Sequence, residues 1–226
     1  MKLLLTSLVI ISASHLNAPE KSAQEEKYFW LSLPEFNCLK TTDDGEDEIY
    51  FVTVGKYSHG GQILQNSKVI SMNDGNRSNS LIKRDIVSFK LKGQESIDLV
   101  CVIMENDDFP REECKALPQK IASYLETRNK NLIDISSADI KTVLDRVNGS
   151  YGNSDDWIGA FKLHVSAEGT VTKHQTLNNP NGLSYGASIT PPYSLRFDGD
   201  GSDYRGFLKI IRCKSRLSCS LVRTNN

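Results

Sequence analysis

Short segments in which apolar and polar residues alternate, or in which β-branched residues predominate, recur along the 226-residue chain. Such segments are typical of β-strands, and turn-rich pieces such as 73–76 and 178–182 separate them. The pattern predicts strands at residues 28–33, 48–54, 68–72, 85–91, 97–104, 157–165, 170–175, 193–197, 204–213 and 217–223. Many short strands joined by turns indicate a mainly β fold, an antiparallel β-sandwich or barrel.

The hydrophobic period changes between residues 111 and 146. Apolar residues there recur at helical spacing, and a Ser136-Ser137 pair offers a helix cap between two such stretches. The residues predicted to face the core are Leu117, Ile121, Tyr124 and Leu125 in the first helix, and Ile140, Val143, Leu144 and Val147 in the second. The sequence therefore predicts one β-sandwich domain over residues 28–226, with a helical hairpin inserted at about 110–148.

The first residues have the order of a cleavable secretion signal. Met1 and Lys2 give a positive start, residues 3–11 are apolar, and residues 12–18 are small or mildly polar. This pattern predicts a signal peptide over residues 1–18, a flexible tail over 19–27, and an exported protein, secreted or periplasmic. No segment reaches the roughly 20 apolar residues that a membrane-spanning helix needs, so a transmembrane protein is not expected.

Charge and cysteine content narrow the possible functions. The chain has 27 basic and 28 acidic side chains, and this near-neutral balance argues against a nucleic-acid-binding protein. Five cysteines in an oxidising compartment favour disulfide formation. Cys213 and Cys219 flank a short turn between two predicted strands, so we expect them to pair. Cys38 and Cys101 lie in apolar strands, where cysteine is often a small buried hydrophobe, and Cys114 is the expected free thiol.

Acidic residues gather in three runs, and each run lies at the end of a predicted strand: residues 43–48, 105–108 and 155–156. The last two runs flank the helical insert, so they should meet if the insert is a side excursion. Carboxylates held close together repel one another unless a cation neutralises them, and calcium, which takes six to eight oxygen ligands, suits such a cluster best. Solvated acidic loops are the simpler explanation for any single run.

Three sequence pieces carry a resemblance to a known family. The segment from Asp43 to Tyr50 is similar to the first acidic loop of the calcium-dependent phospholipid-binding domains of the protein kinase C and synaptotagmin type (C-two domains). Residues 102–107 and 156–159 resemble that family's later acidic strand end and its acid-apolar-apolar-glycine piece. The resemblance implies a C-two-like sandwich with calcium ligands Asp43, Glu48, Glu105, Asp107 and Asp156; the runs add Asp44, Asp47, Asp108 and Asp155 as possible further ligands.

A basic C-terminal hairpin suggests the kind of partner. Lys209, Arg212, Lys214 and Arg216 could face an anionic lipid or protein surface, although a strand edge protected by charge explains them equally well. His59 is the loop histidine that a hydrolase could use, but no nucleophile motif accompanies it, so we do not expect an enzyme.

The sequence predicts a secreted calcium-binding module that bridges to an anionic partner. The alternative is a metal-free adhesion or inhibitor-type protein that binds through the helical insert or the basic hairpin.

Overall fold

The computed structural model describes residues 25–41, 46–67, 69–73, 85–106, 111–148, 157–178, 193–198 and 201–215. In chain order the elements are β1 (Glu26–Lys40), β2 (Glu46–Tyr57), β3 (Gln62–Asn66), β4 (Ile70–Asn73), β5 (Asp85–Lys92), β6 (Ile97–Glu105), α1 (Arg111–Thr127), the short 3-10 helix η1 (Leu132–Asp134), α2 (Ser137–Asn148), β7 (Trp157–Val165), β8 (Val171–Asn178), β9 (Tyr193–Phe197) and β10 (Asp203–Cys213).

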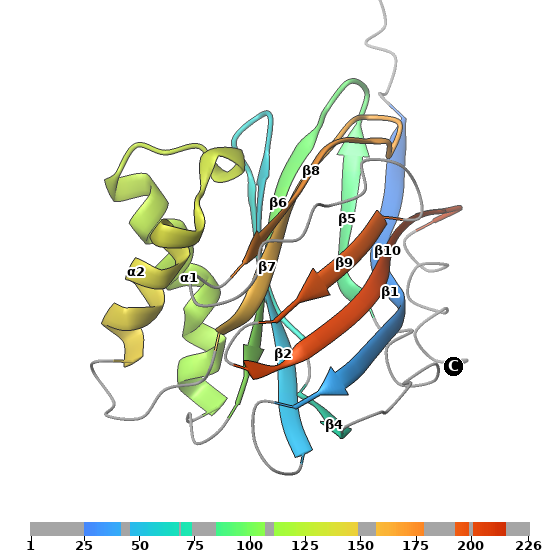
Figure 1. The fold of residues 1–226 in the computed structure, drawn as a ribbon. Helices are drawn as coiled ribbons and strands as arrows, with labels where there is room; N and C mark the ends of the chain where they lie inside the picture. The colour runs from blue at the N-terminus through green and yellow to red at the C-terminus, as the bar shows by residue number, and fades with distance from the viewer. Residues whose placement is uncertain are drawn as a thin grey trace, which may run out of the picture.

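The described strands form two antiparallel sheets that pack face to face. Sheet A has the order β5-β1-β10-β9, and sheet B has the order β3-β2-β6-β7-β8, with β4 also paired to β2. In Figure 1 helices α1 and α2 lie on the side of sheet B that faces away from sheet A, which gives three layers. The predicted β-sandwich with an inserted helical hairpin is therefore confirmed.

The main core lies between the two sheets. Side chains of a strand alternate between its faces, and Phe29, Leu31 and Leu33 of β1 point inward, each at most 1 % exposed. They pack in the same cluster as Leu99 and Ile103 of β6. Burying a side chain of this size stabilises the fold by roughly 1.5–3 kcal/mol relative to leaving it exposed.

A second core joins the helices to the outer face of sheet B. Val100, Val102 and Met104 point to this face of β6 and cluster with Ile121 and Leu125 of α1. Strand β6 is therefore buried on both faces, which explains why its sequence is an almost continuous apolar run rather than an alternating one. All the described helix positions predicted to face the core are buried.

Local hydrogen bonds set the ends of the two helices. Helix α1 is followed by Asn129 in the left-handed region (φ 51°), and the Lys130 N–H donates to the Leu125 carbonyl at 3.0 Å. At α2, Ser136 Oγ accepts the Asp139 N–H at 3.3 Å, while the Asp139 carboxylate accepts the Ser136 N–H at 2.9 Å. This reciprocal capping box confirms Ser136 as the cap that the sequence predicted.

The predicted strands within the described residues all overlap observed ones. Strand β1 is longer than expected: it starts at Glu26, inside the predicted tail, and continues to Lys40. Strand β3 was not predicted, because its Gln-rich sequence shows little alternation.

The signal segment 1–18 and the last predicted strand, 217–223, lie outside the described residues. Among the helices that the structure does describe, none has the length and apolarity to cross a bilayer.

The cysteines divide between the core and the ends of elements. Cys38 and Cys101 form no disulfide and have no exposed surface, which fits the prediction of buried hydrophobes. Burial raises the pKa of the Cys101 thiol to about 12, against a smaller lowering effect from the nearby Thr53 hydroxyl. Cys213 ends β10, whereas Cys219 lies outside the described residues, so the disulfide between them stays a prediction.

Candidate functional site

The acidic runs belong to three neighbouring strands of sheet B. Strand β6 lies between β2 and β7, with Glu105 opposite Ile49 and Met104 opposite Trp157. The end of β6 therefore adjoins both the start of β2 and the start of β7. We call this end of sheet B, where β6 ends and β2 and β7 begin, the acidic end, because the runs 43–48, 105–108 and 155–156 come directly before or after these strand ends in the sequence.

Most of the predicted ligands lie outside the described residues: Asp43, Asp44, Asp107, Asp108, Asp155 and Asp156. Asp47, Glu48 and Glu105 lie on the strands themselves and show how the sheet presents carboxylates here. Across the described part of the chain, no group of three or more histidine, cysteine, aspartate or glutamate residues is arranged to hold a metal ion.

The first two acidic runs are in direct contact through Glu48. The Asn106 backbone N–H donates to the Glu48 carbonyl at 2.8 Å, and the Asn106 side-chain amide donates to Glu48 Oε2 at 3.1 Å. Glu48 and Asn106 therefore face the same side of sheet B. The Glu48 side chain is exposed there, so it could take a cation from solvent.

The Glu105 side chain points to the face of sheet B opposite the one that Glu48 occupies. It continues the alternation of Cys101 and Ile103, which face sheet A, and it is 3 % exposed. Glu48 follows the alternation of Tyr50, which faces the helices. The strand period thus directs the Glu48 and Glu105 carboxylates to opposite faces of the sheet, and the described structure does not bring them together.

Asp47 lies inside the sandwich. Its carboxylate accepts a hydrogen bond from the phenol of Tyr204 on β10, which joins sheet B to sheet A, and neither residue has exposed surface. Burial, and then the bond to Asp47, raise the pKa of Tyr204 far above its ordinary value. The sequence predicts Asp47 as a possible further calcium ligand, whereas its carboxylate points into the sandwich and bonds Tyr204. The signal that could have placed it inward is its alternation with Ile49 and Phe51.

The predicted basic surface lies toward the C-terminal end of β10, whereas Tyr204, which contacts Asp47, lies at its start. Lys209 and Lys214 are exposed, and Arg212 donates to Glu25 at 3.1 Å, while Arg216 is outside the described residues. Strand geometry places residues 209–212 roughly 17–26 Å from Tyr204 at about 3.3 Å per residue. The basic hairpin and the acidic end therefore do not form one surface.

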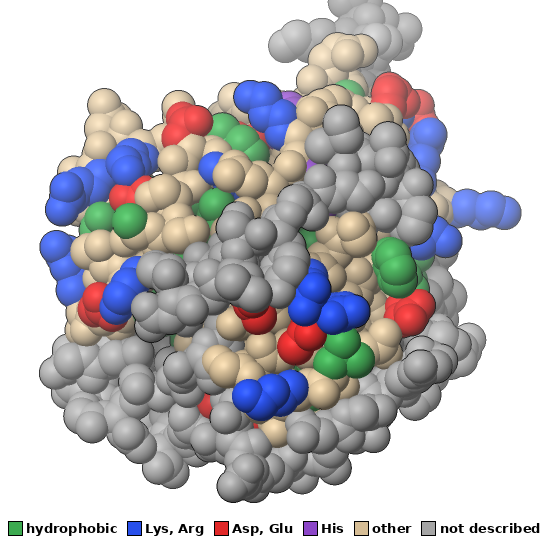
Figure 2. Space-filling model, viewed as in Figure 1, with side chains coloured by type: hydrophobic (Ala, Val, Ile, Leu, Met, Phe, Trp, Pro, Cys, Tyr) green, Lys and Arg blue, Asp and Glu red, His purple; other side chains and the backbone are tan. Residues whose placement is uncertain are grey.

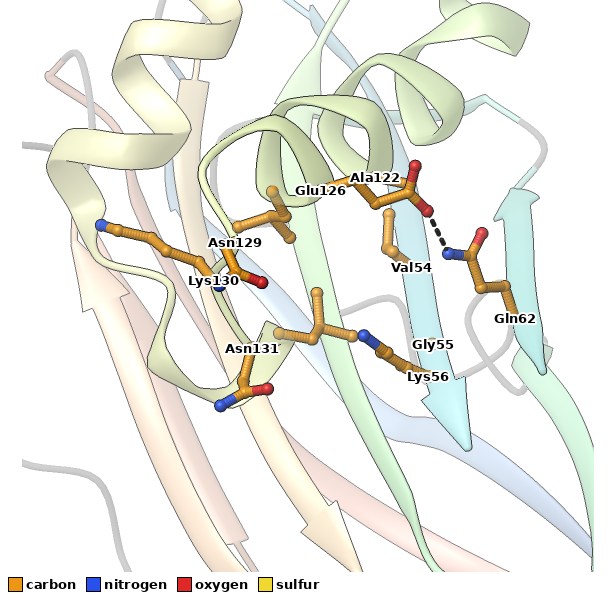
Figure 3. A pocket seen from close by; sticks show the side chains of 11 residues that line it. Val54, Gly55, Lys56, Gln62, Ala122, Glu126, Asn129, Lys130 and Asn131 are labelled. Carbon is orange, nitrogen blue, oxygen red and sulfur yellow. Dashed lines mark hydrogen bonds between the residues drawn. The ribbon is translucent and has the colours of Figure 1, made fainter. Parts of the chain in front are cut away.

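A groove separates the end of α1 from strands β2 and β3 (Figure 3). It encloses about 200 Å³, and its walls include Val54, Lys56, Gln62, Leu125, Glu126, Asn129 and Leu132. Gln62 donates to Glu126 at 2.7 Å, which connects β3 to α1 at the groove's rim. The groove combines an apolar wall with amide and charged groups, as small-molecule and peptide sites do.

His59 lies on the turn after β2, at the opposite end of sheet B from the acidic runs. Its Nδ1 contacts the Glu95 carboxylate, and its ring lies 5.3 Å from that of Tyr57. Ser58 Oγ accepts the Ser96 N–H at 3.1 Å. These contacts tie the β2–β3 turn to the turn before β6.

Comparisons with protein-family models, with curated proteins and with solved structures found no match to this chain. The similarity to C-two domains therefore rests on the sequence pieces alone.

Proposed function

We propose that the chain is an exported calcium-binding module whose acidic end bridges one or two calcium ions to an anionic lipid or protein partner. The observation that supports this proposal is that the strand ends next to the three acidic runs, at Ile49, Glu105 and Trp157, are neighbours in sheet B. Runs that are far apart in the sequence therefore follow or precede neighbouring strand ends of one sheet.

The physical argument is electrostatic. Several carboxylates near one another repel, and each would be stabilised by a shared cation that accepts hard oxygen ligands. Calcium is abundant outside cells, so a site with a dissociation constant of about 10⁻⁴–10⁻³ M would be occupied there. A bound ion with open coordination positions would then attract a phosphate or carboxylate of the partner.

The opposite directions of Glu48 and Glu105 separate two possible sites. A site on the helix side of sheet B would combine Glu48 with loop carboxylates, whereas a site between the sheets would use Glu105. We favour the first, because Glu48 is exposed and Glu105 is buried. Glu48→Gln should then weaken calcium binding, and Glu105→Gln should change calcium affinity little.

Calcium titration of thermal unfolding tests the proposal. Calcium at about 100 times its dissociation constant stabilises a folded protein by roughly 2.7 kcal/mol, which for a domain of this size raises Tm by roughly 5–10 °C. We expect this rise in the wild type and its loss in the double variant Asp107→Asn/Asp156→Asn. Asp145→Asn is the matched control, because Asp145 is an exposed aspartate of α2 that pairs with Lys141. An unchanged Tm at calcium concentrations up to about 100 mM, which is about 100 times the weakest dissociation constant expected, would overturn the proposal.

Vesicle sedimentation then identifies the partner. Vesicles that contain phosphatidylserine should retain the wild type with calcium and release it with EDTA, if lipid is the anion that the ion contacts. Retention that is equal with and without EDTA would instead favour the metal-free binding protein. The groove of Figure 3 is the observation that supports that second candidate.

A further inference from the structure

A pair of arginines lies on the outer face of sheet A, near the start of β10. Arg196 of β9 is directly opposite Arg205 of β10, and Asn37 of β1 is opposite Arg205 on its other side. These three residues therefore form one row across three strands. Like charges directly opposite each other on a sheet are unfavourable, so this pairing needs an explanation.

Asp203 partly supplies that explanation, because its carboxylate bonds both arginines. Arg196 donates from Nε at 3.2 Å and from Nη2 at 3.0 Å, and Arg205 donates from the same two atoms at 3.4 and 3.0 Å. The pKa of Asp203 is lowered, because the two guanidinium groups outweigh the raising effect of burial. Two guanidiniums share the Asp203 carboxylate, and on β1 the Glu35 carboxylate accepts the Asn37 amide at 3.1 Å.

The arginine pair lines a pocket of about 340 Å³. Its other walls come from Asn37, Ser194 and Phe207, and Phe207 is 37 % exposed although it is a large aromatic residue. Figure 2 shows basic, acidic and hydrophobic side chains side by side on this face, over β9 and β10. Pockets of this size hold small organic ligands.

The chemistry of the pocket selects an anion. A guanidinium presents N–H groups in a planar fork that matches the two oxygens of a carboxylate or phosphate. Arg205 uses its Nε and Nη2 atoms to bond Asp203, and its side chain is 49 % exposed. Phe207 offers an apolar surface beside this charge.

We propose that this pocket binds an oxyanion, the carboxylate or phosphate group of a small ligand, through Arg196 and Arg205, with an apolar part of the ligand packed on Phe207. The site needs no calcium, and it is separate from the acidic end of sheet B. Its failure and the failure of the calcium proposal can therefore be told apart, provided that anion binding is measured in EDTA.

Calorimetric titration in EDTA tests the pocket with three probes: phenyl phosphate, phenylacetate and inorganic phosphate. We expect saturable binding of phenyl phosphate, phenylacetate or both, and the tighter of the two identifies the oxyanion. Inorganic phosphate should bind more weakly than phenyl phosphate if Phe207 contributes. Absence of saturable binding by both aromatic probes would overturn the proposal.

Variants locate the binding in the pocket. Arg205→Gln should weaken the tighter probe by roughly tenfold or more, as expected for a lost charge-assisted fork. Arg128→Gln, which removes an exposed arginine next to the end of α1, is the matched control and should change nothing. Phe207→Ala should weaken the aromatic probes and leave inorganic phosphate unchanged. Equal losses in Arg205→Gln and Arg128→Gln would contradict the assignment.

Asp203→Asn gives a result that misfolding cannot imitate. The substitution removes the carboxylate that competes for both guanidiniums, so the probes should bind several times more tightly than to the wild type. Weaker binding by a variant that still unfolds cooperatively would mean that Asp203 positions the arginines only for the fold, and the proposal would fall.

Discussion

Gly206 lies where β10 passes closest to the irregular part of β1. The pairing of the two strands shifts register between Ser32 and Glu35, and Gly206 is opposite Phe36 just beyond that shift. A Cβ atom at position 206 would lie 2.7 Å from the Glu35 carbonyl oxygen and 2.8 Å from Phe36 Cδ2. A backbone oxygen cannot move aside without disturbing the sheet, so only glycine fits here.

Gly206→Ala should therefore lower the free energy of unfolding by about 1–3 kcal/mol, the usual cost of overpacking a well-packed site. Urea denaturation measures this difference. Gly61→Ala is the matched control, because its nearest contact is the movable Tyr57 ring at 3.3 Å, and its effect should be small. Equal stability of the two variants would show that β1 can shift at Glu35.

At the scale of elements, the Ser136–Asp139 capping box links the start of α2 to the end of α1. Lys130 donates to both Asp139 oxygens at 2.7 Å, and Ser136 Oγ donates to Oδ2 at 2.6 Å. Burial alone would raise the pKa of Asp139. The bonds from Lys130 and Ser136 outweigh it and lower the pKa from 3.8 to about 2.

A lowered pKa gives stability that is present at neutral pH and lost in acid. The contribution of Asp139 should be complete above about pH 4 and should disappear as the pH falls toward about 2. Asp139→Asn should cost about 1–2 kcal/mol at pH 7, and its difference from the wild type should shrink below pH 4. Denaturation at several pH values measures this, with the exposed Asp145→Asn as control. A constant difference would exclude linkage through Asp139.

The positions of most elements could be predicted from sequence, because alternation and helical spacing report directly on burial. Strand β3 could not: only Ile63 of its five residues turns toward the sheet-to-sheet core, and Leu64 is 38 % exposed. The sequence also does not predict which face of which sheet the helices cover. An amphipathic face shows that a helix is buried, but it does not show against which face of which sheet.

At the scale of the molecule, the sequence predicts in part that the strand ends beside the acidic runs are neighbours, because the helical insert is an excursion between β6 and β7. Side-chain direction at the strand ends decided the rest: Glu48 and Glu105 diverge, and Asp47 turns inward. The pocket at Arg196 and Arg205 could not be predicted, since it requires the pairing of β9 with β10. Strand pairing is a long-range property that residue spacing does not contain.

The bond between Asp47 and Tyr204 joins the two sheets, and it makes a prediction about the whole molecule. Tyr204→Phe removes the hydrogen-bond donor to a buried carboxylate, so the free energy of unfolding at pH 7 should fall by about 1–3 kcal/mol. Tyr124→Phe on α1, in the other core, is the control.

The effect of Tyr204→Phe should also depend on pH. Burial and Asp47 raise the pKa of Tyr204 in the folded protein, whereas in the unfolded chain it stays near 10. Above pH 10 the unfolded wild type therefore gains stability by ionising Tyr204, at about 1.4 kcal/mol per pH unit. The phenylalanine variant lacks this group, so its deficit should narrow as the pH rises through 10. A deficit that stays constant into alkali would show that Tyr204 ionises without unfolding. Calcium should still raise Tm in this variant, because the favoured site uses the exposed Glu48 and not the buried Asp47 that Tyr204 contacts.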